Sequence, residues 1–128
     1  MAGNVREEYF YISGPYLPGG GGTVGTYTMP VGSKAIIISM VLNTVGSAIS
    51  GSGETSATLT ASGGQTGIIC YMGAGAHAVP GQGYMQSNNG KSISPVLDAS
   101  SEEVTLTLTV DSHSNDECTA SIVGKFIS

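Results

Sequence analysis

Strict alternation of aliphatic residues with threonine runs through residues 104–110 and constrains the fold more than any other feature of the chain. A period of two residues places one kind of side chain on each face of a strand, and valine, leucine and threonine all suit a half-buried pleated surface. A shorter stretch of the same kind occupies residues 57–61. No window of twelve residues shows the period of a helix, because glycine or proline interrupts almost every candidate. The chain is therefore predicted to be all-β.

The other strands follow from turn-forming residues. Residues 34–42 are more continuously apolar, which is typical of a central strand covered on both faces. Residues 30–33 make a tight connection into that strand, residues 62–65 and 112–116 are expected to close hairpins, and residues 88–91 turn the chain once more. The expected strands are 23–29, 34–42, 57–61, 67–72, 84–86, 92–97, 104–110 and 118–127. Seven or eight short antiparallel strands without a helix predict a β-sandwich or jelly-roll.

The first 22 residues differ from the rest. They hold a cluster of aromatic residues at 9–12, and four consecutive glycines follow at 19–22. Because such a glycine run fixes no conformation cheaply, we interpret residues 1–22 as an N-terminal arm on a hinge, and residues 23–128 as the sandwich domain. The alternative is an ordinary first strand followed by a loose loop. The arm residues expected to bind a partner are Tyr9, Phe10, Tyr11, Ile12, Tyr16 and Leu17.

Charged residues make up only 10% of the chain, against about 25% in a typical soluble domain. Glycine, serine and threonine together supply 49 of the 128 residues. The surface is therefore either rich in hydroxyl groups or hidden against neighbours. The threonine-rich strands also carry almost no lysine to protect a sheet edge, so loops or another subunit must cover the edges. We favour oligomerisation.

The charge balance argues against nucleic acid and membranes as partners. The formal net charge is −5, and the four basic residues are scattered, whereas phosphate and anionic lipid surfaces require clustered Lys and Arg. No apolar run is long enough to span a membrane. The start of the chain lacks the apolar stretch of a signal peptide, so we expect synthesis in the cytoplasm. In that compartment Cys70 and Cys118 are expected to be buried free thiols, although a bridge between them is the alternative.

No motif indicates catalysis, a metal or a cofactor. His77 lies among small residues without a nearby acid or nucleophile, so we interpret it as a polar loop residue. Residues 111–117 contain the densest group of metal-ligating side chains, but the spacing does not match a calcium loop, and a solvated hairpin tip is the simpler interpretation. Glycines 19–22 lack the following lysine of a phosphate-binding loop. We therefore expect a protein that is not an enzyme and needs no cofactor.

A sugar-binding site is the remaining candidate for a small ligand. Tyrosines and amides cluster between residues 71 and 88, and flat aromatic faces beside amide groups are suited to sugars. The residues of this possible ligand loop are Tyr71, Tyr84, Gln86 and Asn88. The alternative is that Tyr71 is simply a strand residue with its hydroxyl at the rim of the sheet.

Two stretches of the chain resemble a known group of proteins. Residues 26–43 contain a strand, a Pro-Val-Gly turn and an apolar strand that ends in Asn43, and residues 94–98, 104–110 and 121–127 look like the closing half of the same pattern. Together they resemble the small β-sandwich virion proteins of tailed bacteriophages, and the size, acidity and arm are most similar to head decoration (cement) proteins.

The resemblance implies a structural role on the outside of a phage head. Such a protein would be made in the host cytoplasm, would bind the major capsid protein and neighbouring copies of itself, often as a homotrimer, and would stabilise the shell. The alternative within the same setting is a tail-fibre or receptor-binding module that recognises a host surface glycan through the possible ligand loop.

Overall fold

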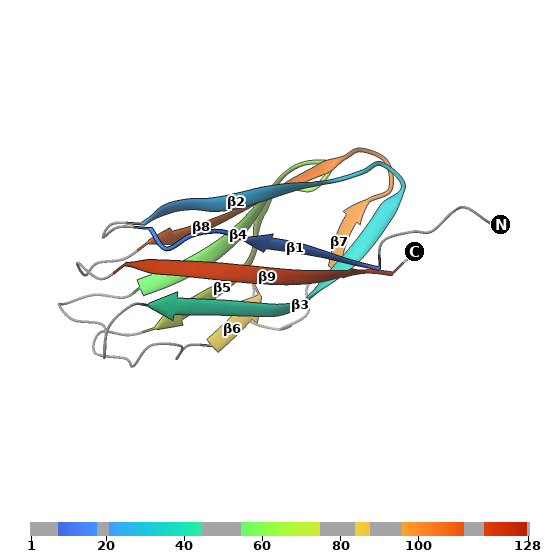
Figure 1. The fold of residues 1–128 in the computed structure, drawn as a ribbon. Helices are drawn as coiled ribbons and strands as arrows, with labels where there is room; N and C mark the ends of the chain where they lie inside the picture. Colours follow the sequence, from blue (N-terminus) through green and yellow to red (C-terminus); the bar gives the residue numbers. More distant parts are fainter. Residues whose placement is uncertain are drawn as a thin grey trace.

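Nine antiparallel strands in two stacked sheets make up the computed structural model, which describes residues 8–17, 21–44, 55–74, 84–87, 96–111 and 117–127 (Figure 1). Seven of the strands overlap those expected from the sequence over most of their length, whereas β7 (Val96–Ala99) shares only residues 96 and 97 with the expected strand 92–97, and residues 92–95 lie outside the described residues. The ninth is the first strand. The strands are β1 (Tyr9–Ser13), β2 (Gly22–Met29), β3 (Ser33–Thr44), β4 (Thr55–Gly63), β5 (Gly67–Ala74), β6 (Tyr84–Ser87), β7 (Val96–Ala99), β8 (Val104–Asp111) and β9 (Cys118–Phe126).

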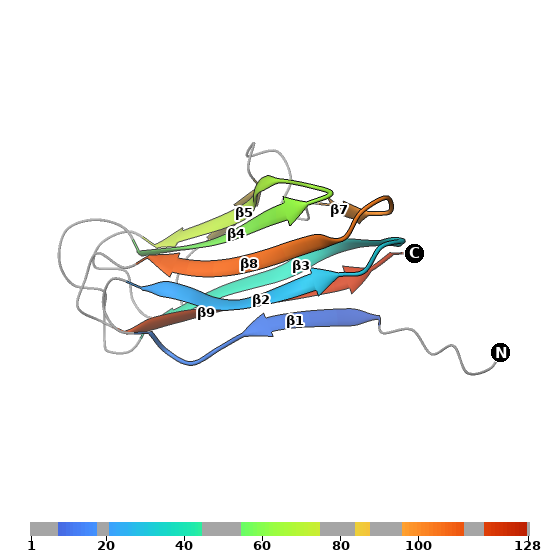
Figure 2. The same cartoon turned by 90° about the horizontal axis from the view of Figure 1, so that it is seen from above.

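The two sheets interleave the beginning and the end of the chain. Sheet A has the order β1-β9-β3-β7, and sheet B has the order β2-β8-β4-β5-β6. The chain therefore changes sheets at each of its first three connections. Along one side of the sandwich, the end strands β1 and β2 lie next to each other (Figure 2). The expectation of an antiparallel, sandwich-like all-β fold is confirmed.

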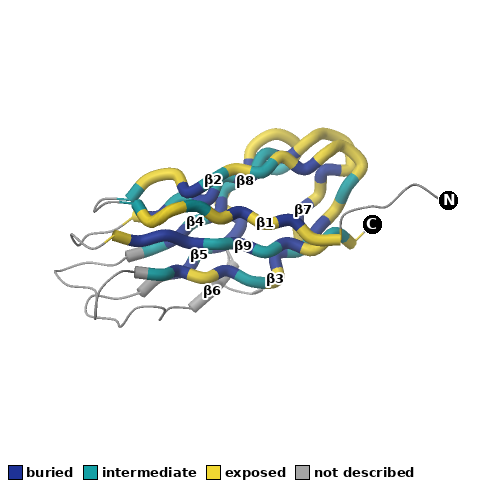
Figure 3. Tube along the Cα trace, viewed as in Figure 1, coloured by how far each residue is buried: buried dark blue, intermediate teal, exposed yellow. Residues whose placement is uncertain are grey.

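The core consists of the inward positions of the alternating strands. In β8 every second side chain from Val104 to Val110 is buried, and the threonines between them are half-buried on the other face. The same alternation of buried and exposed positions is visible along β1 (Figure 3). The largest fully buried side chains include Phe10 of β1 in sheet A, and Leu59 of β4 and Leu106 of β8 in sheet B. The two cysteines are buried and free, as expected.

One expected hairpin is confirmed and the other is wrong. Strands β4 and β5 pair antiparallel around residues 62–65, where Gly63 adopts a φ of +101° that only glycine takes readily. Strands β8 and β9 do not pair, because β8 belongs to sheet B and β9 to sheet A. The chain therefore crosses between sheets after Asp111. Residues 112–116 themselves, like residues 88–91, lie outside the described residues.

The threonine-rich strands are not sheet edges, contrary to expectation. Strand β8 lies between β2 and β4, and β4 lies between β8 and β5. Their backbone groups are therefore paired on both sides within sheet B. The edges of the two sheets are instead formed by β1, β7, β2 and β6.

The segment expected to form an arm contains strand β1 of sheet A. It pairs with β9 along its whole length, and Phe10 and Ile12 are each only 2% exposed. Further along, Leu17 exchanges two backbone hydrogen bonds with Cys118, at 2.8 and 3.0 Å. The ordinary first strand, the alternative interpretation of this segment, is the one found here. Of the glycine run, residues 19 and 20 lie outside the described residues.

Candidate protein-binding site

The outer face of sheet B is covered with hydroxyl groups. Serine and threonine alternate with core residues on three neighbouring strands, and the strand registers align them in rows; Thr28, for example, lies opposite Thr105, and their hydroxyl oxygens are 3.1 Å apart. We call this surface the hydroxyl face, and it consists of Thr26, Thr28, Ser56, Thr58, Thr60, Ser62, Thr105, Thr107 and Thr109. The hydroxyl groups hydrate this part of the surface, although it carries few charges.

The outer face of sheet A is rich in exposed apolar side chains, which lie beside Ser13, Ser39 and Ser121. It carries aliphatic and aromatic side chains from all four strands, several of them far more exposed than is usual for their type: Tyr11 is 65% exposed and Val96 56%. We call it the apolar face, and it consists of Tyr9, Tyr11, Ile36, Ile38, Val41, Val96 and Val123. Exposed patches rich in apolar side chains mark interaction surfaces in soluble proteins.

Strand β3 is buried on one face only, although the sequence predicts burial on both faces. Residues 34–42 predict a strand buried on both faces. One face is buried, with Ile37 at 0% exposure, but Ile38 and Val41 on the other face are 41% and 38% exposed. The expectation is therefore wrong for the isolated chain. The apolar side chains on the second face are available to a partner.

Charged groups lie at the margins of the apolar face. The Lys125 ammonium lies 5.9 Å from the centre of the Tyr9 ring, a distance suited to a cation–π contact. Lys34 lies opposite Asp98 in the register of β3 and β7. The Ser100 hydroxyl and backbone N–H, and to a smaller degree Lys34, hold the pKa of the Asp98 carboxyl below its usual value. No run of like charges crosses the described part of this face.

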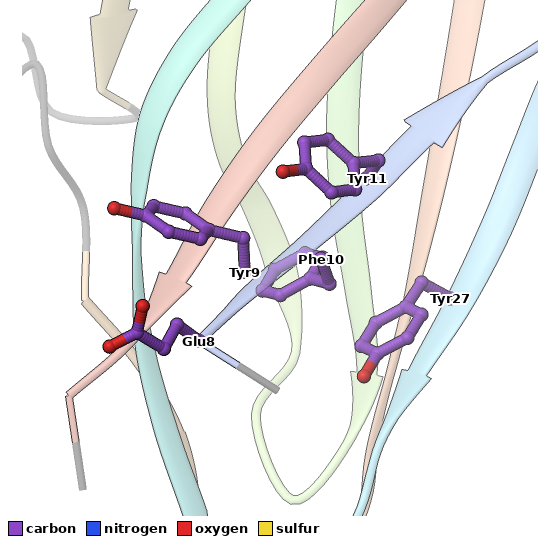
Figure 4. A pocket seen from close by; sticks show the side chains of 5 residues that line it. All are labelled: Glu8, Tyr9, Phe10, Tyr11 and Tyr27. Carbon is purple, nitrogen blue, oxygen red and sulfur yellow. The ribbon is translucent and has the colours of Figure 1, made fainter. Parts of the chain in front are cut away.

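A groove of about 390 Å³ opens beside β1, between the edges of the two sheets (Figure 4). Its inner wall is a pair of stacked rings, Phe10 from β1 and Tyr27 from β2, with centres 4.5 Å apart and planes within 4° of parallel. Glu8, Tyr9 and Tyr11 complete the lining. The groove is therefore aromatic with one carboxylate among its lining groups.

The absence of a side chain at Gly124 leaves room for the Phe10 ring. Phe10 lies opposite Gly124 in the pairing of β1 with β9, and a methyl group on Gly124 would collide with the ring. Phe126 also contacts Phe10, with ring centres 5.5 Å apart. The ring therefore lies over bare backbone, the arrangement by which an aromatic side chain compensates for a strand glycine.

The predicted arm residues separate into two sets. Phe10 and Ile12 are part of the chain's own core, because every second side chain of β1 turns inward. Tyr9, Tyr11 and Tyr16 are exposed. The sixth residue of that group, Leu17, is half-buried against the core.

The possible ligand loop is only partly described. Tyr71 is half-buried on β5 and lies opposite Gln86 of β6, while Tyr84 lies opposite Gly73. Asn88 lies outside the described residues.

The described residues contain no group of three or more His, Cys, Asp or Glu side chains that could hold a metal ion. His77 and His113 lie outside the described residues, as does most of the 111–117 cluster. A smaller depression of about 180 Å³ involves Asp98, whose backbone N–H donates to the Gln65 side chain at 2.8 Å. The described part of the chain also contains no helix long and apolar enough to cross a membrane.

Sequence reasoning missed most of the apolar face and Tyr27 of the groove. The one signal that pointed to the face was the unbroken apolar run at residues 34–42. Tyr27 carried no signal, because its neighbour in the groove comes from a strand in the other sheet. Comparison with protein-family models and with curated proteins finds no match, so geometry and sequence are the basis for inferring a function.

Proposed function

We propose that this chain is a structural virion protein, a decoration or cement protein that binds the outer surface of a bacteriophage head and stabilises it. The observation that carries the proposal is the difference between the two outer faces of the sandwich. The apolar face would dock on the shell, and the hydroxyl face would point to solvent. A protein with one wettable and one apolar broad face is suited to coating another surface.

The strand order supports a jelly-roll, the finer form of the predicted fold. In the order β1-β9-β3-β7 over β2-β8-β4-β5, strands of the first half alternate with strands of the second half, as in two interleaved Greek keys. Strand β6 would then be an addition at the edge. Jelly-rolls are common in viral capsid proteins, although fold by itself does not determine function.

The stabilisation would come from repeated binding. Each copy that binds the assembled shell and not its separated subunits shifts the equilibrium toward the shell by mass action. Neighbouring copies, as the homotrimer that we favour, would add avidity without further contacts to the shell. The net charge of −5 suits a position outside the shell, away from packaged DNA.

The test is binding to phage heads. Heads and tails from the phage whose genome carries this sequence would be stripped of accessory proteins, mixed with the purified chain and separated on a density gradient. We expect the wild-type chain to sediment with heads, and the double variant Ile38→Lys/Val41→Lys to remain unbound. The matched control, Thr58→Lys/Thr107→Lys on the hydroxyl face, should still bind.

Other outcomes of this experiment would contradict the proposal. Binding that survives the two lysines on the apolar face would contradict docking through that face. Binding that is lost only with the two lysines on the hydroxyl face would identify the hydroxyl face as the docking surface. Recovery of the chain with tails would favour the alternative of a tail-fibre module that binds a glycan. The register of Tyr71 opposite Gln86, which brings an aromatic residue next to an amide residue, is the observation that favours that alternative.

A further inference from the structure

The outer edge of β1 carries an unused row of backbone hydrogen-bonding groups. The Phe126 N–H donates to the Glu8 carbonyl at 2.8 Å. In an antiparallel pair, such hydrogen-bonded positions alternate with positions whose backbone groups point away from the partner strand. The register of β1 with β9 therefore directs the N–H and C=O groups of Tyr9, Tyr11 and Ser13 away from β9. At Ser13 strand β2 already lies close, since a methyl group on Gly25 would be 3.6 Å from the Ser13 carbonyl oxygen, so Tyr9 and Tyr11 form the open part of the edge. No strand of the described chain lies beyond β1.

The other three edges are shorter or carry protective features. Strand β2 has an irregular register between Thr23 and Gly25, and bulges of this kind discourage pairing. Strand β7 has four residues and presents the exposed carboxylate of Asp98. Strand β6 also has only four residues. Strand β1 has no charged residue, no proline and no register shift between Tyr9 and Ser13.

The aromatic groove lies along this same edge. Four consecutive residues from Glu8 to Tyr11 line it together with Tyr27. In Figure 4 the Tyr9 and Tyr11 rings lie on one side of β1, and the Phe10 ring lies on the other side with Tyr27. A strand added beside β1 would therefore direct one of its inward-facing side chains toward the Phe10–Tyr27 pair. The edge supplies main-chain hydrogen bonds and the groove supplies a place for a side chain, the two parts of strand-addition recognition.

We infer that the edge of β1 and its aromatic groove bind an extended segment of another protein, which adds to sheet A as a fifth strand. A segment of about three residues matches the open part of the edge, from Tyr9 to Tyr11. The inferred segment has a large apolar or basic side chain aimed at the stacked rings. The Glu8 carboxylate and the net charge of −5 favour a neutral or basic segment over an acidic one. This inference rests on the edge geometry and is independent of the virion setting.

A second copy of the same strand is a poorer fit. If β1 of another copy paired here, its inward side chains would be Phe10 and Ile12, which are already buried in the core of that copy. It would have no large side chain left for the groove. A foreign segment has no such restriction.

The experiment begins with a displayed library of random nine-residue peptides, selected on the full chain. The selected peptide is synthesised, and backbone amide exchange of the chain is followed by NMR with and without it. We expect enrichment of sequences with one large apolar or basic side chain. We also expect the bound peptide to slow exchange at Tyr9 and Tyr11, while Phe10 and Ile12 exchange slowly in both states, since β9 already pairs with them.

Two variants separate the edge from the ring of Tyr11. Tyr11→Pro removes an N–H that points outward and is tolerated at such an edge position, so affinity should fall by about tenfold or more. Tyr11→Thr removes the ring and keeps the N–H, and should retain strand addition. Slow exchange at Phe10 and Ile12 in each variant verifies that β1 is still folded.

N-methylated peptides test the main-chain hydrogen bonds that the bound peptide itself donates. N-methylation of one set of alternate residues in the peptide should abolish binding, and N-methylation of the other set should leave it largely intact. Equal binding to the Tyr11→Pro variant, an effect of neither methylated set, or a library without any binder would overturn the inference. Protection of Tyr9 and Tyr11 in the chain alone, lost on dilution, would also overturn it by identifying a second copy as the occupant.

Discussion

At the scale of single residues, the best-defined feature is the contact between Phe10 and Gly124. The ring occupies the space that a side chain at position 124 would need, and it stacks on Tyr27. This contact joins the edge strand of sheet A to its neighbour β9 and to the edge strand of sheet B. The position of β1 therefore depends on the absence of one methyl group.

Gly124→Ala is expected to destabilise the chain by displacing Phe10. Overpacking of this kind costs about 1–3 kcal/mol in the free energy of unfolding. The smaller ring-free side chain of Phe10→Leu should relieve the clash, so the double variant should lose less stability than the sum of the two single variants. Chemical denaturation of all four proteins measures this coupling. Strictly additive effects would contradict the contact.

Burial protects the thiol of Cys70. Burial raises the pKa of this group from 9.0 to about 12, and its sulfur lies 3.9 Å from that of Met40 in the core. Because the thiolate is the reactive form, iodoacetamide at pH 8 should modify Cys70 only after denaturant is added. Rapid modification of the native chain, located by peptide mass spectrometry, would contradict the buried position.

The same shift has a consequence for stability at high pH. The unfolded thiol ionises near pH 9 and the folded one near pH 12, so ionisation favours the unfolded chain between these values. The contribution of Cys70 to stability is therefore complete below pH 9 and is lost as the pH rises toward 12. Cys70→Ala should remove this part of the pH dependence.

At the scale of elements, β1 is where the structure departs most from the sequence-based prediction. An arm on a glycine hinge would leave a folded sandwich when residues 1–22 are deleted. Since Phe10 and Ile12 are buried, the deletion should instead lower the free energy of unfolding by about 5 kcal/mol or more, which is comparable to the total stability of many domains.

Circular dichroism during thermal unfolding distinguishes the two outcomes. The shortened chain should be largely unfolded at 25 °C or melt far below the full chain. A deletion of residues 1–7, which keeps β1, is the control for shortening as such. A cooperative transition at an unchanged temperature after deletion of residues 1–22 would restore the arm interpretation.

The strands could be predicted from the sequence, but most of their partners could not. Alternation in residues 104–110 determines which side chains turn inward, and the β4–β5 hairpin follows from its glycines. Turn residues at 112–116 are compatible both with a return into the same sheet and with a crossing to the other one. The choice depends on distant contacts, such as β9 with β3. Tyr9–Ile12 is apolar throughout and so showed no alternation.

At the scale of the whole molecule, the account depends on the contrast between the apolar face and the hydroxyl face. The low charge of the sequence left two possibilities, a wettable surface or a hidden one. In the described chain, sheet B has a wettable outer face, whereas the apolar face of sheet A is suited to being hidden against a partner. The composition indicated that the surface is either rich in hydroxyl groups or covered by neighbours. Which description fits which face follows only from the pairing of the strands into two sheets.

The most direct test of this account is hydroxyl-radical footprinting of the chain, free and bound to phage heads. The account expects binding to reduce oxidation of Tyr11, Ile38 and Val41 on the apolar face. Ile68 and Tyr71 of strand β5 in sheet B should be oxidised equally in both states, and they are the internal controls. Protection of Ile68 and Tyr71, with Tyr11, Ile38 and Val41 unchanged, would contradict the assignment of the apolar face as the docking surface.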